Sequence, residues 1–264
     1  MLVVKIGGSE GINYNEFLQD FSRFDSAILI HGGSNELNRL SKKLNYPPRI
    51  LKSASGYTSR FTDRKTMHMF NMIYAGKMNK MIVEKLQKLG KNAVGLTGLD
   101  GRLFEGVQNK ALRVIDNGKK RLIRGDMTGR VKKMNTDLMN CLIEMGYTPV
   151  LTPPVISNEN IPINVDGDRL AAFVAGTMKA EELYILSNVP GLLKNIQDDS
   201  SIIKNIKKGE IDDYISQYAK GRMKKKLIGA KEALELGVSK VVLSGARFEN
   251  PLTNALKGEG TVIK

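Results

Sequence analysis

Apolar residues recur along the chain in two periods, one typical of buried β-strands and one typical of amphipathic helices. Short apolar runs such as 2–6 and 27–31 have the length of strands that are buried on both faces. Between them, residues 15–24 place four large apolar side chains on one side at helical spacing. Strands that alternate with helices favour an α/β protein with a largely parallel sheet, since parallel strands need a crossover connection.

The same alternation continues to the end of the chain, with one interruption. Residues 101–133 carry short apolar pairs between Gly, Asn and Lys, which predicts hairpins in place of another strand–helix–strand unit. No repeat or interdomain linker divides residues 1–264, so we expect one continuous domain. Further helices are predicted at residues 37–44, 62–74, 77–89, 135–145, 168–177, 211–218 and 223–236. Further strands are predicted at residues 93–96, 148–151, 183–186, 240–243 and 261–263, with a short strand leading into Asn164.

Composition restricts the class of protein. Apolar residues make up 41% and charged residues 26%, as in ordinary globular proteins. A single cysteine, Cys141, excludes an internal disulfide and a cysteine-built zinc site, and no apolar run approaches the ~20 residues that span a bilayer. We therefore expect a soluble, cytoplasmic protein without membrane contact. The net charge of +14 calls for an anionic partner, whether nucleic acid, an acidic protein, an anionic surface or small anions.

Two predicted strands end in glycine pairs, Gly7-Gly8 and Gly32-Gly33, each followed by serine. Glycine lets the backbone approach a ligand closely, and the N-terminus of a following helix favours an anion. For each pair taken singly, a tight turn between strand and helix is the favoured explanation. Neither pair fits the P-loop or the G-x-G-x-x-G dinucleotide pattern, so a nucleotide site would need another architecture.

Several charged residues stand in unusual places. Lys5 interrupts an apolar strand, which is costly unless an anion neutralises the lysine or its end reaches water. Asn164, Asp166 and Asp168 alternate before an apolar helix, and a helix N-cap accounts for only one of the two carboxylates. Three lysines, 224–226, open a later helix against its dipole, either as a solvated surface or as an anion site.

Taken in order, these residues resemble the motifs of a known family. The chain is similar to the amino acid kinase superfamily, specifically its N-acetylglutamate kinase branch. Within that branch it resembles kinases that act on aminoadipate or glutamate attached to a small acidic amino-group carrier protein. The resemblance runs from Lys5 to about Ile263. Its motifs are Lys-x-Gly-Gly from Lys5, His31-Gly32-Gly33-Ser34, Gly56 with Arg60-Phe61-Thr62, Asn164-x-Asp166-x-Asp168, Leu186–Leu192, and Gly-x-Met-x-x-Lys ending at Lys226.

The resemblance implies a fold, an assembly and cofactors. The fold would be a three-layer αβα sandwich with a largely parallel central sheet. Residues 1 to about 170 would form an acyl-amino-acid substrate lobe, and about 171–264 an ATP lobe. The protein would be a homodimer that uses ATP, with Mg²⁺ held mainly by the ATP phosphates and by no protein metal ligand.

It also implies roles for individual residues. Lys5 and Lys226 would stabilise charge on the transferring phosphoryl group, and Asp168 would orient both lysines. Residues expected to bind the amino-acid substrate are Gly32, Gly33, Ser34, Arg60 and Asn164. Residues expected to bind ATP are Gly7, Gly8, Ser187, Asn188, Val189, Gly191 and Leu192. The chain departs from the family in having Ser34 where a third glycine is common and two more residues between Gly56 and Arg60, which leaves the size of the substrate open.

The expected reaction transfers a phosphoryl group to a side-chain carboxylate of carrier-linked aminoadipate or glutamate, in lysine or arginine biosynthesis. A carboxylate with a pKa near 4 is already ionised, so no general base is needed. Residues 119–133 contain seven basic residues and one acidic one, and with Arg49 and Lys52 they form a candidate docking surface for the acidic carrier. A solvated basic surface explains the same residues.

Three alternatives remain at this point. The substrate could be free N-acetylglutamate. A uridylate or isopentenyl phosphate kinase would bind a phosphate instead of a carboxylate, and the Arg60-Phe61-Thr62 motif argues against both. A nucleic-acid-binding protein is favoured by the basic runs 119–133 and 220–226. It is disfavoured by an aromatic content of only 6%, the absence of Trp and the lack of a recognised binding module.

Overall fold

One large sheet forms the centre of the protein. The computed structural model describes residues 1–53, 58–116 and 119–264. In these ranges the eleven-stranded sheet has the order β13-β15-β14-β12-β1-β2-β10-β6-β9, with β5 and β11 also paired to β10. Pairing is parallel except between β14 and β15, β10 and β11, and β6 and β9. Its strands are β1 (Leu2–Ile6), β2 (Ala27–His31), β5 (Ala93–Gly98), β6 (Phe104–Gln108), β9 (Gly129–Met134), β10 (Thr148–Ser157), β11 (Pro162–Ile163), β12 (Glu182–Ser187), β13 (Asn205–Ile206), β14 (Lys240–Gly245) and β15 (Thr261–Ile263).

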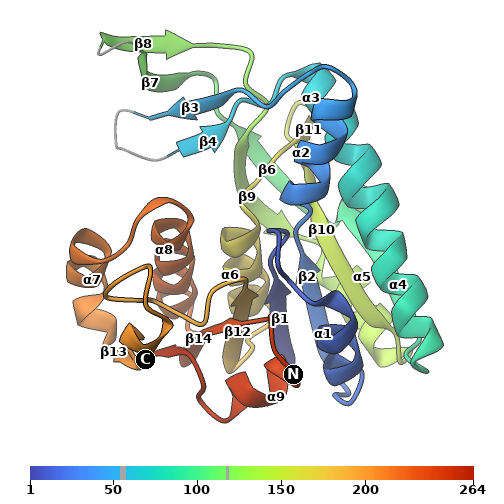
Figure 1. Cartoon of the computed structure of the whole chain (residues 1–264). Coiled ribbons are helices and arrows are strands. Elements are labelled where there is room, and N and C mark those ends of the chain that lie inside the picture. The colour runs from blue at the N-terminus through green and yellow to red at the C-terminus, as the bar shows by residue number, and fades with distance from the viewer. Residues whose placement is uncertain (54–57, 117–118) are drawn as a thin grey trace.

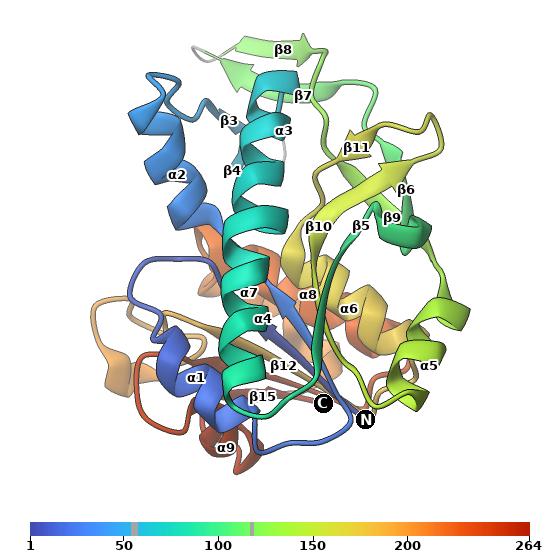
Figure 2. The same ribbon diagram turned by 90° about the vertical axis from the view of Figure 1, so that its right-hand side faces the viewer.

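Helices cover both faces of this sheet (Figures 1 and 2). One face packs against α1, α4 and α9, and the other against α5, α6 and α8. The expected three-layer αβα fold is therefore confirmed. The helices are α1 (Tyr14–Phe21), α2 (Ser34–Lys43), α3 (Arg64–Asn71), α4 (Asn79–Lys88), α5 (Thr136–Glu144), α6 (Gly167–Thr177), α7 (Ile211–Gln217), α8 (Gly221–Glu235) and α9 (Pro251–Leu256).

The alternation of side chains along β1 decides where Lys5 points. Val3 belongs to the core on the α6 and α8 side, whereas Val4 and Ile6 belong to the core on the α1 and α4 side. Successive side chains of a strand point to opposite faces, so Lys5 shares the side of Val3. It is therefore directed toward α6 and α8.

Two expectations about helices and strands were wrong. Residues 62–74 and 77–89 do not form two separate helices, because a π-helical segment at Met72–Met78 joins α3 to α4 without a break. No proline interrupts this stretch. A π-helical turn has more residues than an α-helical turn, so the helix can continue through it. The strand expected to end at residue 151 continues to Ser157, through Pro153 and Pro154. Prolines normally end a strand, but here the pairing partners of β10 change from β2 and β5 to β6 and β11.

The predicted hairpins in residues 101–133 are confirmed. Strand β6 pairs antiparallel with β9, and between them lies the hairpin of β7 (Leu112–Asp116) and β8 (Lys119–Ile123). A second hairpin, β3 (Ile50–Lys52) with β4 (Thr58–Arg60), was too short to be recognised from the pattern. A bridge between Ser53 and Val114 brings the two hairpins together, and both lie at the top of Figure 1. No helix in the described ranges is long and apolar enough to span a membrane.

Candidate active site

A deep cleft opens where β1, β2 and β12 end. Its volume is about 1360 Å³. In open α/β sheets the carboxyl ends of the strands are the usual place for a ligand. The cleft collects every residue that the sequence nominated for catalysis or binding. These are Lys5, Gly7, Gly8, Gly32, Gly33, Ser34, Arg60, Asn164, Asp168, Ser187, Asn188, Val189, Gly191, Leu192 and Lys226.

The two glycine pairs form the floor of this cleft and pack directly against each other. A Cβ atom on Gly8 would lie 2.2 Å from the Gly33 nitrogen and 2.6 Å from the Gly32 carbonyl carbon, so a side chain does not fit there. The Asn35 N–H donates to the Gly8 carbonyl at 2.8 Å, and Ser34 Oγ donates to the same oxygen at 3.0 Å. Glycine is thus needed for the contact between the loops, which a single strand-to-helix turn would not require.

A buried carboxylate between two lysines lies beside this floor. Lys5 Nζ lies 2.7 Å from Asp168 Oδ1, and Lys226 Nζ lies 3.3 Å from Asp168 Oδ2. All three residues are buried, each less than one-tenth exposed. Gly229 of α8 allows the approach of α6, because a Cβ there would be only 3.2 Å from the Asp168 backbone. Residues 5, 168 and 226 are far apart in sequence, so only the tertiary fold brings them together.

The alternation of Asp166 and Asp168 has a structural explanation. Asp166 is the N-cap of α6 and accepts from the backbone N–H of Asp168 at 3.0 Å. Its other oxygen lies 3.8 Å from Lys225 Nζ. Asp168 instead points to Lys5 and Lys226. Each carboxylate thus faces a lysine of the run 224–226, which is therefore not merely a solvated surface.

Burial and charge shift the pKa values in this cluster. Burial alone would raise the pKa of Asp168, but the charges of Lys226 and Lys5 outweigh burial and hold it well below the usual range. Burial lowers the pKa of Lys226 from 10.5 to about 8, with Asp168 opposing the shift and Lys5 adding to it. At neutral pH the cluster contains one negative and two positive charges. It therefore keeps an excess positive charge next to the glycine loops.

His31 also lines the cleft but adds no charge to it. Its Nδ1 lies 3.0 Å from the Gly32 carbonyl oxygen, and its Nε2 lies 3.1 Å from the side-chain nitrogen of Asn79. Burial lowers the pKa of His31 to about 4, so the ring is neutral at pH 7. This agrees with a packed side chain at the end of a strand.

Arg60, the last residue of β4, and Asn164, directly after β11, both line the cleft. Arg60 Nη2 donates to Asn38 Oδ1. Its Nη1 is buried and has no hydrogen-bond partner among the described residues, as expected of a guanidinium that awaits an anion. Asn164 Nδ2 donates to Thr62 Oγ1 at 3.3 Å. The motif residue Gly56 lies outside the described residues.

The segment after β12 borders the other end of the cleft. The Leu192 N–H donates to Thr261 Oγ1 at 2.8 Å, and the Leu192 side chain is buried. A Cβ on Gly191 would lie 2.6 Å from the same Thr261 oxygen. Gly191 and Leu192 therefore define the edge of the cleft by packing against Thr261. The Leu192 N–H already has a hydrogen-bond acceptor within the protein.

Sequence reasoning missed two residues that line the cleft. Tyr74 lies under Gly33, whose Cβ would be 3.2 Å from the tyrosine ring, and it stacks on Phe70 at 3.8 Å between ring centres. The sequence pattern marked it only as the end of a predicted helix, which gave no signal for a place in the cleft. Arg222 Nη1 donates to Ser9 Oγ at 2.6 Å. It occupies a variable position of the Gly-x-Met-x-x-Lys motif, which gave no signal.

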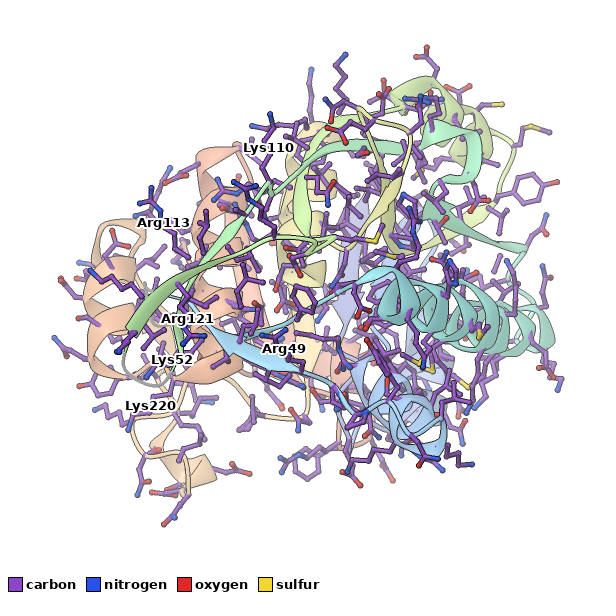
Figure 3. All side chains as sticks on the ribbon, turned by 90° about the horizontal axis from the view of Figure 1, so that it is seen from above. Arg49, Lys52, Lys110, Arg113, Arg121 and Lys220 are labelled. Atoms are coloured by element: carbon purple, nitrogen blue, oxygen red, sulfur yellow. The ribbon has the colours of Figure 1, made fainter. Side chains whose placement is uncertain are left out.

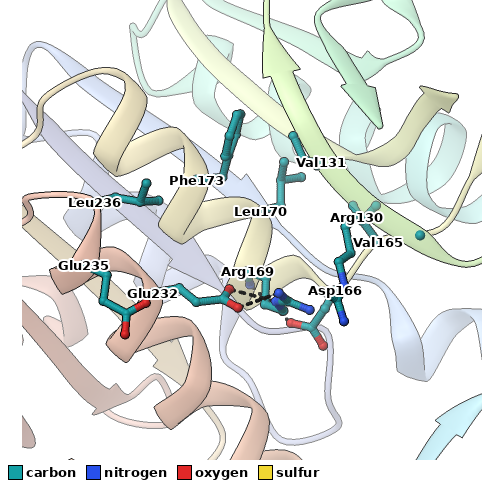
Figure 4. A pocket seen from close by; sticks show the side chains of 11 residues that line it. Arg130, Val131, Val165, Asp166, Arg169, Leu170, Phe173, Glu232, Glu235 and Leu236 are labelled. Atoms are coloured by element: carbon teal, nitrogen blue, oxygen red, sulfur yellow. Dashed lines mark hydrogen bonds and ion pairs between the residues drawn. The ribbon is translucent and has the colours of Figure 1, made fainter. Parts of the chain in front are cut away.

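A smaller side pocket of about 250 Å³ adjoins the cleft between α6, α8 and β9 (Figure 4). Arg169 Nε of α6 donates to Glu232 Oε2 of α8 at 2.7 Å across this pocket. The pair ties the helix of Asp168 to the helix of Lys226, and the two helices pack closely.

The chain belongs to the amino acid kinase family, whose model matches residues 1–244. It is 51% identical to the LysW-aminoadipate kinase of Deinococcus radiodurans over 100% of this chain and 91% of that protein. It is 48% identical to the LysW-aminoadipate kinase of Thermus thermophilus over the full length of both. The solved structure of smu.665 from Streptococcus mutans has the same fold, with a TM-score of 0.75 at 21% identity, over 100% of this chain and 98% of that one.

Proposed function

We propose that this protein is an ATP-dependent kinase that phosphorylates the side-chain carboxylate of aminoadipate carried by LysW, in lysine biosynthesis. The names of the two relatives at 51% and 48% identity support this substrate. Glutamate on the same carrier, in arginine biosynthesis, is a second candidate substrate. We further propose a cytoplasmic homodimer, as the resemblance to the family implies.

The observation that carries the proposal is the Lys5–Asp168–Lys226 cluster beside the glycine loops. In the reaction, a carboxylate oxygen forms a bond to the γ-phosphorus of ATP, and the bond from that phosphorus to the ADP oxygen breaks. The products are an acyl phosphate and ADP. Negative charge is concentrated where the two anions meet, so catalysis consists of positioning and charge stabilisation. The ammonium groups of Lys5 and Lys226 would provide the stabilisation, and Asp168 would fix their positions.

Substrate and nucleotide would occupy opposite ends of the cleft. Arg60 and Asn164 would hold the amino acid together with the loop Gly32, Gly33 and Ser34, within the lobe of residues 1 to about 170. Lobe 171–264 would hold ATP through Ser187, Asn188, Val189, Gly191 and Leu192, with Gly7 and Gly8 at the phosphates. The described residues contain no group of three His, Cys, Asp or Glu able to hold a metal. Mg²⁺ would be held mainly by the phosphates of the nucleotide, as the resemblance to the family implies.

The hairpins supply a surface suited to an acidic carrier. Ile50 and Ser59 of the first hairpin and Leu112 of the second line the cleft, so both hairpins border the proposed substrate end. Basic side chains cover their outer side (Figure 3). Asp126, the one acidic residue of the segment 119–133, is buried, so the exposed charges of the described part of this segment are all positive. These are Lys119, Lys120, Arg121, Arg124, Arg130, Lys132 and Lys133.

Hydroxylamine trapping of the acyl phosphate tests the proposed function. Four substrates are compared: aminoadipate and glutamate, each linked to LysW, and free N-acetylaminoadipate and N-acetylglutamate. We expect hydroxamate and ADP in equal amounts with carrier-linked aminoadipate, and much lower turnover with the free compounds. Faster turnover of free N-acetylglutamate than of either carrier-linked form would overturn the proposed substrate and leave the kinase activity intact.

Charge reversal on the second hairpin should selectively weaken turnover of the carrier-linked substrate. In the variant with Lys119, Lys120 and Arg121 changed to Glu, we expect kcat/KM for carrier-linked aminoadipate to fall about tenfold or more, because complementary charge raises the association rate. In the wild type the same constant should fall with salt, since the Debye length shrinks from about 10 Å at 0.1 M to about 3 Å at 1 M. Turnover of free N-acetylaminoadipate should change little in either test.

The matched control reverses three exposed lysines that do not line the cleft, Lys204, Lys207 and Lys257. It should leave the carrier-linked turnover unchanged. Equal effects of the two triple reversals, or equal salt slopes for the two substrates, would remove the hairpin from the docking surface.

A further inference from the structure

The root of the second hairpin runs between the two residues assigned to amino-acid binding. On one side, the Met127 N–H donates to the Thr62 carbonyl at 2.7 Å, two residues after Arg60. On the other side, the Asn164 N–H donates to the Met127 carbonyl at 2.7 Å, and the Gly129 N–H donates to the Asn164 carbonyl at 2.9 Å. The segment 126–129 therefore connects the Arg60 side of the cleft to the Asn164 side.

A single buried carboxylate organises this connection. Asp126 is 1% exposed, and its Oδ1 accepts from the Thr62 N–H at 2.9 Å. Its Oδ2 accepts from the Thr128 N–H at 3.1 Å and from the Thr128 hydroxyl. A buried carboxylate needs such donors, and hydrogen bonds to a charged acceptor are stronger than neutral ones. Asp126 does not line the cleft.

The same network reaches the proposed substrate residues directly. Thr62 Oγ1 accepts from the Asn164 side chain at 3.3 Å and donates to the Arg60 carbonyl at 3.4 Å. Thr62 is fully buried, so its backbone position is set by its neighbours in the protein. Displacement of the Thr62 N–H from Asp126 would move Arg60 and Asn164 together.

We propose that Asp126 is a positioning residue that fixes Arg60 and Asn164 relative to each other through the root of the β7–β8 hairpin, and thereby sets the affinity for the amino-acid substrate. The inference rests on the proposed function for the identity of that substrate. Asp126 touches neither substrate nor nucleotide in this assignment. Segment 126–129 continues into the β7–β8 hairpin, which is proposed to contact the carrier. Docking of the carrier on that hairpin would therefore act on the same hydrogen-bond network.

Asp126→Asn is the sharpest variant, because it keeps the shape of the side chain. An amide has only one acceptor oxygen, so its NH₂ group must face either the Thr62 N–H or the Thr128 N–H, where donor opposes donor. The chain offers a matched control in Asp20. This carboxylate is also 1% exposed, and it accepts from two backbone N–H groups, of Leu252 and Thr253, and from the Thr253 hydroxyl. Asp20 lies on α1 and holds the start of α9, away from the cleft.

In Asp126→Asn we expect the KM for carrier-linked aminoadipate to rise about tenfold. The kcat and the KM for ATP should stay within about threefold of the wild type. This is the effect expected when a charged hydrogen bond that only orients a binding group is lost. The control substitution is Asp20→Ala, because both backbone N–H groups donate to the same oxygen of Asp20, which an amide would keep. Asp20→Ala removes the acceptors of Leu252 and Thr253, so it should lower the melting temperature at least as much and leave all three constants unchanged. A purely structural role for Asp126 would make the two variants alike. That result, or a fall in kcat with unchanged KM for the amino acid, would overturn the proposal.

Amide hydrogen exchange gives a readout that does not depend on activity. In Asp126→Asn, exchange should quicken about tenfold or more at Thr62, Met127 and Asn164 together, and stay unchanged in α9. Asp20→Ala should show the reverse pattern, because the N–H groups of Leu252 and Thr253 lose their acceptor. Unchanged exchange at Thr62 and Asn164 in Asp126→Asn would overturn the positioning role. Absence of acyl phosphate from every substrate in the wild type would instead overturn the proposed function, and the exchange result would still decide about Asp126.

Discussion

Replacing Lys5 or Lys226 by Ala should lower kcat about 10²–10³-fold, as removal of one preorganised charge contact does in other enzymes. The KM for ATP should change by less than about threefold, because an interaction made mainly in the transition state appears in kcat and not in binding. Initial rates of ADP formation against ATP concentration measure both constants. A kcat within about threefold of the wild type in either variant would remove that lysine from the catalytic cluster.

The pH dependence of kcat/KM distinguishes the role of the charge of Lys226 from the role of its side-chain shape. The pKa of Lys226 is about 8 in the folded protein, so the ammonium group loses its proton as the pH rises through this value. The kcat/KM of the wild type should therefore fall by up to about tenfold per pH unit above pH 8, since this constant reports the free enzyme. In Lys226→Arg the guanidinium stays protonated, and the alkaline fall should disappear even if the maximal rate is lower. An unchanged alkaline limb in Lys226→Arg would show that another group titrates.

Loss of either lysine also leaves Asp168 with one partner in a buried position. That change destabilises the fold. The melting temperature of each variant should therefore be measured together with its rates. Substitution of each lysine by Met, which keeps the length of the apolar stem, provides a second variant without the charge. Folded Lys→Met variants with the same loss of kcat would attribute the effect to charge.

Gly8→Ala should lower kcat/KM by more than about 10²-fold, comparable to other misplacements of reacting groups by about 1 Å. The added Cβ would meet backbone atoms at 2.2, 2.6 and 2.7 Å, which belong to Gly33, Gly32 and Ser34. Backbone atoms cannot rotate away as a flexible side chain can, so the two loops must separate. Since both loops line the cleft, their separation moves the groups proposed to face the phosphoryl group.

Gly209→Ala is the matched control for Gly8→Ala. A Cβ at Gly209 has no neighbour within 4 Å, and its backbone does not require glycine. This variant should stay within about twofold of wild-type kcat/KM, as expected of surface changes. Activity of Gly8→Ala within tenfold of the wild type would show that the loops can separate without harm and that their close contact is not needed for the reaction.

Much of the fold follows from local pattern alone. The runs at β1, β2, β12 and β14 are predominantly apolar, and the helices between them have clear apolar faces, so element type and order could be predicted. The hairpins were indicated by glycine and asparagine between short apolar pairs. The pattern failed where local signals were weak or misleading. Strand β3 is only three residues long, and Pro153 and Pro154 concealed the second half of β10.

Part of the candidate site could likewise be predicted from the sequence, and part could not. Motifs nominated Lys5, Asp168 and Lys226, and the cost of a lysine in a buried strand already suggested an anionic partner for Lys5. The sequence therefore determined which chemical groups the protein possesses and the order in which they occur. The residue pattern alone did not show that one carboxylate contacts both lysines; only the resemblance to the family implied it. The contact itself depends on the packing of α6 against α8 at Gly229.

Tertiary structure alone decided three properties of the site. The Gly8 and Gly33 loops touch each other, the Nη1 atom of Arg60 is buried without a partner, and Asp126 connects Arg60 to Asn164. Local pattern records the periodicity and preference of short segments, and the residues of these contacts are 25 or more positions apart in the chain. Asp126 looked like the single acidic exception in a basic segment. Only its burial, with three donors around it, made it part of the site.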